Sequence, residues 1–178
     1  IMVEYHYWQA RCLHEAGADV ICFETVPAFQ EGEAILKALD LLPDGLQAWA
    51  SFTCKDGERL RHGSQFADAV KLFQSNAKVA RIGINCTDSS FVSSLLRSAR
   101  DGCSSPLKPF VVFPNSGEEF DRDKGGWQPT GRVDFADNGA LLREWMELGA
   151  DVVGGCCRIY AEDIAKIRRT VDDYNRGK

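Results

Sequence analysis

Three cysteines are placed where they could act together on a substrate. Cys86 follows an apolar run that begins at residue 79, and the adjacent Cys156 and Cys157 end a run that begins at residue 151. If both runs are parallel strands of one sheet, their carboxyl ends meet at the same edge, and the three thiols converge there. Gly154 and Gly155 give the backbone freedom to aim both neighbouring thiols at one point. Three soft thiolate ligands predict a zinc ion whose fourth tetrahedral position is open, which is the pattern of a catalytic site.

A zinc ion with an open position suits chemistry on a sulfur substrate. It lowers the pKa of a bound thiol and keeps it as a thiolate nucleophile at neutral pH. With three thiolates already bound, the metal is a poor Lewis acid for carbonyl chemistry, so alkyl transfer to sulfur fits better. Such a site needs no strong general base, and we expect none of the three histidines, His6, His14 and His62, to be functional.

The other four cysteines have a different interpretation. We expect Cys12, Cys22, Cys54 and Cys103 to be buried as small hydrophobic residues. The total of seven is odd, which fits a secreted disulfide framework badly, so reduced thiols are expected. Two other uses of the segment 154–157 are less favoured. A redox pair would need a strained disulfide between neighbours, and a phosphate-binding loop would need a Lys or Ser/Thr at a spacing that is not found.

Short apolar runs alternate with stretches of helical period along the chain. The interval between successive runs is typical of βα units, which predicts an α/β fold with one parallel sheet and right-handed crossovers. An amphipathic helix precedes the first run. The expected strands are 19–24, 47–52, 79–85, 109–114 and 151–156, and the expected helices after them are 31–42, 64–75, 90–99, 135–148 and 161–174.

Other polar residues also follow these strands. Glu24 follows the first strand at the same edge as the cysteines. Thr25, Ser51 and Asn115 end strands at that edge too, where turn formation or capping explains each of them equally well.

A long connection, residues 115–133, could cover the site as a lid or remain an exposed loop. Its one large aromatic residue, Trp127, would suit the binding of a cation, although packing on the rim of the sheet is the favoured role.

Four segments together resemble one enzyme family. They are Gly83-Ile-Asn-Cys86, Pro114-Asn-Ser-Gly117, Gly154-Gly-Cys-Cys-Arg158 and Phe23-Glu-Thr-Val-Pro27, and they closely resemble the zinc-dependent homocysteine S-methyltransferase family, with a match from about residue 5 to residue 171. The resemblance implies a (β/α)8 TIM barrel that transfers a methyl group from S-methylmethionine or S-adenosylmethionine to homocysteine, forming methionine. It also implies that Cys86, Cys156 and Cys157 hold Zn²⁺, and that the Glu24 carboxylate holds the homocysteine ammonium. Betaine-dependent relatives share this barrel.

Five βα units are fewer than the eight of a closed barrel, which typically takes about 250 residues. The chain opens on Ile1 inside an expected helix, and it contains no Asp-Gly-Gly segment, which the family carries on its first strand. We therefore expect residues 1–178 to be a single homocysteine-binding-like domain that lacks about three N-terminal βα units. The alternative function is a catalytically inactive zinc-binding fragment that needs its N-terminal half.

Composition limits the class of protein and of partner. The 178 residues are 44% hydrophobic and 26% charged, which predicts a globular chain with one core. The formal net charge of -5 includes no basic stripe, so nucleic acid is not an expected partner. No apolar run approaches the roughly 20 residues of a membrane span, and no targeting segment is recognised. We expect a cytoplasmic protein that acts on small molecules, with no prediction of its oligomeric state.

Overall fold

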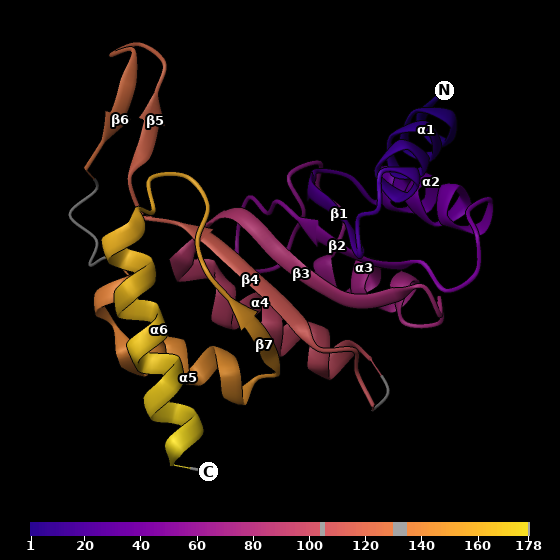
Figure 1. Cartoon of the computed structure of the whole chain (residues 1–178). Helices are drawn as coiled ribbons and strands as arrows, with labels where there is room; N and C mark the ends of the chain where they lie inside the picture. Colours follow the sequence, from indigo (N-terminus) through magenta and orange to yellow (C-terminus); the bar gives the residue numbers. More distant parts are fainter. Residues whose placement is uncertain (104–105, 130–134, 178) are drawn as a thin grey trace.

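The computed structural model describes residues 1–103, 106–129 and 135–177 (Figure 1). The helices are α1 (Met2–Glu15), α2 (Phe29–Asp40), α3 (Phe66–Phe73), α4 (Ser89–Gly102), the 3-10 turn η1 (Phe135–Asp137), α5 (Gly139–Glu147) and α6 (Ala161–Arg176). The strands are β1 (Val20–Val26), β2 (Gln47–Phe52), β3 (Val79–Asp88), β4 (Phe110–Asn115), β5 (Glu119–Asp121), β6 (Gly126–Gln128) and β7 (Ala150–Val153). None of the described helices is long and apolar enough to cross a membrane.

Five strands form one parallel sheet in the order β1-β2-β3-β4-β7. This order follows the chain without the reversal that marks a doubly wound sheet. Successive right-handed crossovers in one direction place all connecting helices on the same face of the sheet, as Figure 1 shows. The predicted α/β architecture is therefore confirmed. Within the described residues, β1 and β7 each pair with one neighbour and form the two edges of the sheet.

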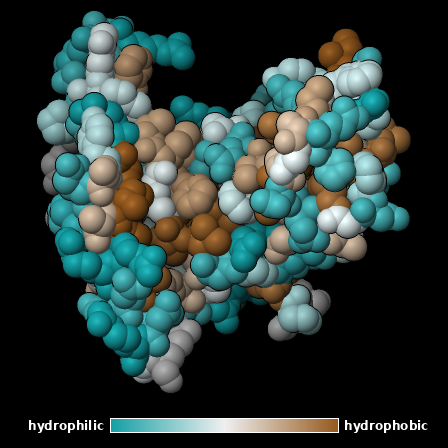
Figure 2. All heavy atoms as spheres, in the orientation of Figure 1, coloured by the Kyte–Doolittle hydropathy of each residue, from teal (hydrophilic) through white to brown (hydrophobic). Residues whose placement is uncertain are grey.

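The two faces of the sheet differ in what covers them. On one face, strand residues such as Ile21, Ile82 and Val112 are buried in a single hydrophobic core with the helices. The opposite face carries Trp49 and Arg81, which are half-buried, and no described helix covers it. Figure 2 shows apolar residues in a hollow in the middle of the view, where Figure 1 places β4.

The expectation for the four other cysteines was right in part. Cys54 is buried and Cys103 is half-buried. Cys12 and Cys22 are exposed, and for these two the prediction was wrong. Cys12 lies on the solvent side of α1, and Cys22 alternates with the buried Ile21 and Phe23 on β1.

Most expected element boundaries differ from the observed ones by one to three residues, and the last strand, expected over 151–156, ends at Val153 before the cysteine pair. The strand after residue 79 continues past Asn85 to Asp88, with a shift of register against β4. The expected helix 135–148 is a 3-10 turn followed by α5, because the Asn138 side chain accepts a hydrogen bond from Leu141 N and starts a new helix there. The long connection 115–133 contains the antiparallel β5–β6 hairpin, which projects from the body of the molecule (Figure 1). The last residues of that connection, 130–133, lie outside the described residues.

Candidate metal centre

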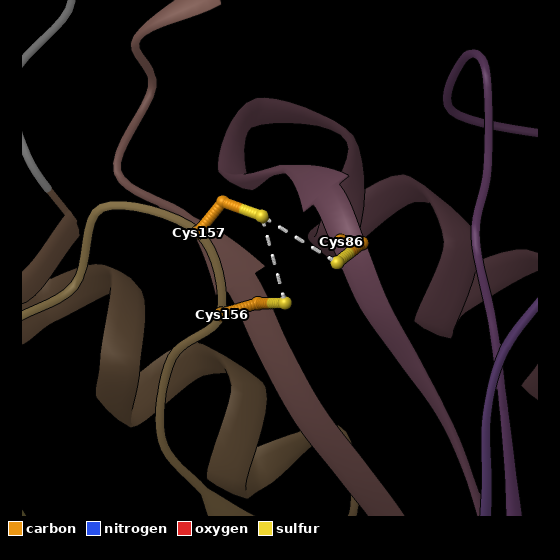
Figure 3. A group of neighbouring side chains, drawn as sticks. All are labelled: Cys86, Cys156 and Cys157. Carbon is orange, nitrogen blue, oxygen red and sulfur yellow. Dashed lines mark hydrogen bonds between the residues drawn. The ribbon is translucent and has the colours of Figure 1, made fainter.

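The three predicted cysteines lie together at the carboxyl ends of β3 and β7 (Figure 3). The Sγ atom of Cys86 is 3.8 Å from Sγ of Cys157, which is 4.0 Å from Sγ of Cys156. All three sulfurs lie within 4.8 Å of one another. Four-coordinate zinc with zinc–sulfur bonds of about 2.3 Å separates its sulfur ligands by about 3.8 Å. The spacing of the sulfurs therefore fits a tetrahedral metal ion.

The backbone of the adjacent Cys156 and Cys157 is held by the neighbouring strand β4. The amide of Cys156 donates to the Pro114 carbonyl at 2.8 Å, and the amide of Cys157 donates to Oδ1 of Asn115 at 3.2 Å. A Cβ atom at Gly155 would overlap the Ile159 side chain, so the turn before the pair needs a glycine. Asn115, for which a capping role was one expectation, thus fixes the segment that carries two of the thiols.

Asn85 is a positioning residue that reasoning from the sequence did not identify. It is 1% exposed, and its Oδ1 accepts hydrogen bonds from Thr25 N at 2.7 Å and from Ser51 Oγ at 2.8 Å. Its Nδ2 donates to Thr25 Oγ1 at 2.7 Å. One buried amide therefore ties the ends of β1 and β2 to the residue that precedes Cys86. The signal in the sequence was a polar residue inside an apolar run, directly before a cysteine.

Strained backbone is concentrated around this network. Thr25, Cys86 and Arg158 have φ values of 60°, 48° and 66°, a left-handed region that residues with a Cβ rarely adopt. Thr25 is hydrogen-bonded to Asn85, Cys86 is one of the three close cysteines, and Arg158 directly follows Cys157. The hydrogen bonds of Asn85 to Thr25, and of Thr53 Oγ1 to the Cys86 carbonyl at 3.0 Å, compensate for this conformation.

The close thiols change one another's acidity. Hydrogen bonds from Cys86 and Cys157 lower the pKa of Cys156 to about 6. The pKa of Cys86 is raised by its hydrogen bond to Cys156 and by burial, and burial also raises the pKa of Cys157. The close thiols therefore favour a thiolate within the group, and such a charge attracts a cation.

Glu24 lies two strands away from Cys86, on β1, and it is exposed. Its Oε1 accepts a hydrogen bond from Trp49 Nε1 at 3.3 Å. It does not belong to the group of close sulfur ligands, but its neighbour Thr25 is bonded to the residue that precedes Cys86. The structure thus connects Glu24 to the cysteines through the backbone and leaves its carboxylate open on the uncovered face.

Comparison with known proteins gives a consistent result. A family model described as homocysteine S-methyltransferase matches residues 1–171. The chain is 37% identical to homocysteine S-methyltransferase YbgG of Bacillus subtilis over 93% of this chain and 51% of that protein. It is 38% identical to the betaine-homocysteine S-methyltransferase of Drosophila melanogaster over 90% of this chain and 49% of that protein.

A solved structure shares the fold. The metallated form of the homocysteine methyltransferase MmuM from Escherichia coli matches with a TM-score of 0.74 and 31% sequence identity, over 94% of this chain and 51% of that chain. The chain therefore spans about half the length of the relatives that it matches.

Proposed function

The chain belongs to the homocysteine S-methyltransferase family, and from this we propose that it is the C-terminal part of an enzyme that methylates homocysteine to methionine. The methyl donor in this proposal is a sulfonium compound, S-methylmethionine or S-adenosylmethionine. The observation that carries the proposal is the convergence of three cysteine sulfurs at tetrahedral spacing.

Cys86, Cys156 and Cys157 are the residues that would hold zinc in this proposal. Their sulfur-only donor set suits zinc, and a metallated form of the related MmuM supports the presence of a metal. When bound, zinc lowers the pKa of a coordinated thiol, so that a thiol substrate is present as the nucleophilic thiolate at neutral pH.

The side chains around the cysteines would orient the substrate. In this proposal the Glu24 carboxylate binds the homocysteine ammonium, and the hydrogen bond from Trp49 holds that carboxylate in place. The amino acid then lies between β1 and the cysteines, with its sulfur at the carboxyl end of β3. Asn85 fixes both ends of this arrangement, because it holds Thr25 and directly precedes Cys86.

The transfer itself needs no side-chain acid or base. The substrate sulfur forms a bond to the methyl carbon in line with the breaking carbon–sulfur bond of the donor, and the electron pair of that bond stays on the donor sulfur. A positively charged sulfonium thus leaves as a neutral thioether. Alignment of the two substrates is the contribution that the protein makes.

The open sheet suggests how the rest of the enzyme would be built. We propose that the five parallel strands of this single domain, residues 1–178, are continued by about three further βα units into an eight-stranded barrel. Exposed Glu24 and half-buried Trp49 lie on the face that would become its interior. The same exposure favours a second candidate, in which the isolated chain binds zinc but does not catalyse methyl transfer until its N-terminal half is supplied.

Zinc content tests the metal centre directly. We expect about one zinc per reduced chain, and loss of that zinc in the Cys156→Ser variant. Cys12→Ser is the matched control, because Cys12 is an exposed thiol on α1, and it should keep the full zinc content. In the cobalt-substituted chain, addition of homocysteine should change the sulfur-to-metal absorption. A folded chain that binds no metal would refute the metal centre.

Turnover separates the two candidates. Methyl transfer from S-methylmethionine by the isolated chain would show that the 178 residues are sufficient. Transfer that occurs only after an N-terminal segment from a relative is added would instead show that this chain is one half of the active site.

A further inference from the structure

An ion pair on the uncovered face of the sheet joins the two strands that lead to the thiols. Arg81 of β3 donates to the Asp151 carboxylate of β7 through a fork of two nitrogens: Nε lies 2.9 Å from Oδ1, and Nη2 lies 2.9 Å from Oδ2. The two strands are not neighbours, because β4 lies between them (Figure 1). The pair therefore spans β4 and links the strand that carries Cys86 directly to the strand that precedes Cys156.

The backbone is irregular at both partners of this ion pair. Against β4, the pairing of β7 moves from Ala150 to Val152, so Asp151 is an extra residue. Against β2, the pairing of β3 moves from Val79 to Arg81, so one extra residue directly precedes Arg81. A β-bulge of this kind changes the direction of the side chains beside it. Each of the two strands thus has an irregularity at the position where it contributes to the ion pair.

The position of β7 along the sheet decides whether the thiols meet. Cys86 follows Arg81 by five residues, and Cys156 follows Asp151 by the same number. Within the described residues, β7 is an edge strand of four residues with three pairing positions on β4, so its own ladder specifies its register weakly. A slip of one residue would move the cysteine pair by about 3.3 Å along the sheet. That movement is almost as large as the 3.8 Å between Sγ of Cys86 and Sγ of Cys157.

We propose that the Arg81–Asp151 ion pair is a register lock, which holds β7 at the position along β3 where the three thiols meet. Both are positioning residues, because they act through the strands and would not touch the metal. This inference rests on the proposed metal centre and adds the residues that align its two halves. The planar fork of the guanidinium fixes direction as well as distance. The side chains are 32% and 41% exposed, so salt weakens the pair in this chain.

A role in stability alone would have a different signature. An ion pair that only stabilises the fold changes the free energy of unfolding and leaves the arrangement of the thiols in the folded chain as it is. A register lock changes that arrangement in chains that remain folded. The decisive measurement therefore compares distances between thiols under native conditions.

Cross-linking of the thiols makes this comparison without any metal. Dibromobimane links two nearby thiols, and Cys157 has two partners at nearly equal distances: Sγ of Cys86 at 3.8 Å and Sγ of Cys156 at 4.0 Å. The link to Cys156 is local and does not depend on the register, whereas the link to Cys86 joins two strands. Peptide mapping of the reduced, metal-free 178-residue chain gives the ratio of inter-strand to local links.

Four variants test the ion pair. Asp151→Asn should lower the link ratio about threefold, because a partly exposed ion pair contributes energy of that order. Arg81→Met should lower it equally, and the double variant should lower it no further, since either single change removes the whole pair. Arg81→Lys keeps the charge without the fork and should give an intermediate ratio. The matched control is Arg168→Gln, which breaks a 2.8 Å ion pair with Asp172 inside α6 and should leave the ratio unchanged.

Zinc affinity is the second readout, and we expect Asp151→Asn to weaken it about threefold in competition with a chromophoric chelator. An unchanged link ratio in Asp151→Asn, with circular dichroism showing a folded chain, would overturn the proposal even if urea denaturation shows lower stability. If that variant does not fold, the ratio in Arg81→Lys decides in the same way. A wild-type chain that holds no zinc, but whose link ratio falls in the variants, contradicts the metal centre and supports the register lock. Zinc binding with the same link ratio in all folded variants contradicts the register lock alone.

Discussion

Asn85 shows how much of this site depends on one side chain that would touch neither metal nor substrate. Its amide is buried among β1, β2 and β3, and it makes three hydrogen bonds there. The left-handed conformations of Thr25 and Cys86 flank these bonds. A residue in this role orients a neighbouring metal ligand and does not itself bind the metal.

We predict that Asn85→Leu weakens zinc binding by about 10- to 100-fold, because Thr25 and Ser51 lose their partner and the strand end that carries Cys86 relaxes. The measurement is competition for zinc with a chromophoric chelator. Ser51→Ala, which removes only one of the three bonds, should give a smaller loss. If Asn85→Leu folds and binds zinc as tightly as the wild type, Asn85 is not a positioning residue.

The sequence alone predicted that the three thiols lie together, but it did not identify the residues that hold them in place. Cys86 and Cys156 could be placed together because strand ends of a parallel sheet share one edge. The partners of Asn85 lie 60 and 34 residues earlier in the chain, and no local pattern reveals such pairings. Burial of Cys22 was predicted wrongly, since an apolar run does not show which of its two faces is covered.

At the scale of elements, the site depends on how closely β3 and β4 approach. Gly83 lies opposite Val111 in the sheet, and a Cβ atom at Gly83 would overlap the Val111 carbonyl. Cys86 lies near the end of β3, and Asn115, whose side chain holds Cys157, ends β4. The distance between the two strands therefore affects the distance between the thiols.

We predict that Gly83→Ala lowers the free energy of unfolding by about 3 kcal/mol, the upper part of the range for overpacked interiors, because the two strands must separate. Urea denaturation followed by circular dichroism measures this. Gly126→Ala is the control, since nothing lies within 4 Å of a Cβ at that position, and it should change stability little. Equal stability of the two variants would contradict the close approach.

Strands and helices were easier to predict than the connections between them. Each of the five apolar runs is a strand of the sheet, because buried parallel strands are continuously apolar. The β5–β6 hairpin was missed, since its strands are three residues each, too short for an alternating pattern.

At the scale of the whole molecule, the chain exposes apolar side chains on α1 as well as on the uncovered face of the sheet. Tyr5 and Trp8 are 59% and 50% exposed and lie one helical turn apart. An exposed group of this kind is a surface at which chains associate.

We predict that the isolated chain associates as its concentration rises and that the double variant Tyr5→Gln/Trp8→Gln reduces this association. Sedimentation velocity across a concentration series is the measurement. Leu41→Gln removes one exposed apolar residue at the end of α2 and is the control, with association expected to stay near that of the wild type. A wild-type chain that stays monomeric throughout would contradict the prediction.

The separation of the thiols along the chain has a consequence for synthesis. Cys86 precedes Cys157 by 71 residues, and the two meet only after β7 has joined β4. A nascent chain on the ribosome carries Cys86 long before its partners have been made. Binding of one metal ion by all three thiols therefore requires that β7 has been made and has joined β4, and metal loading would report that this strand is in place.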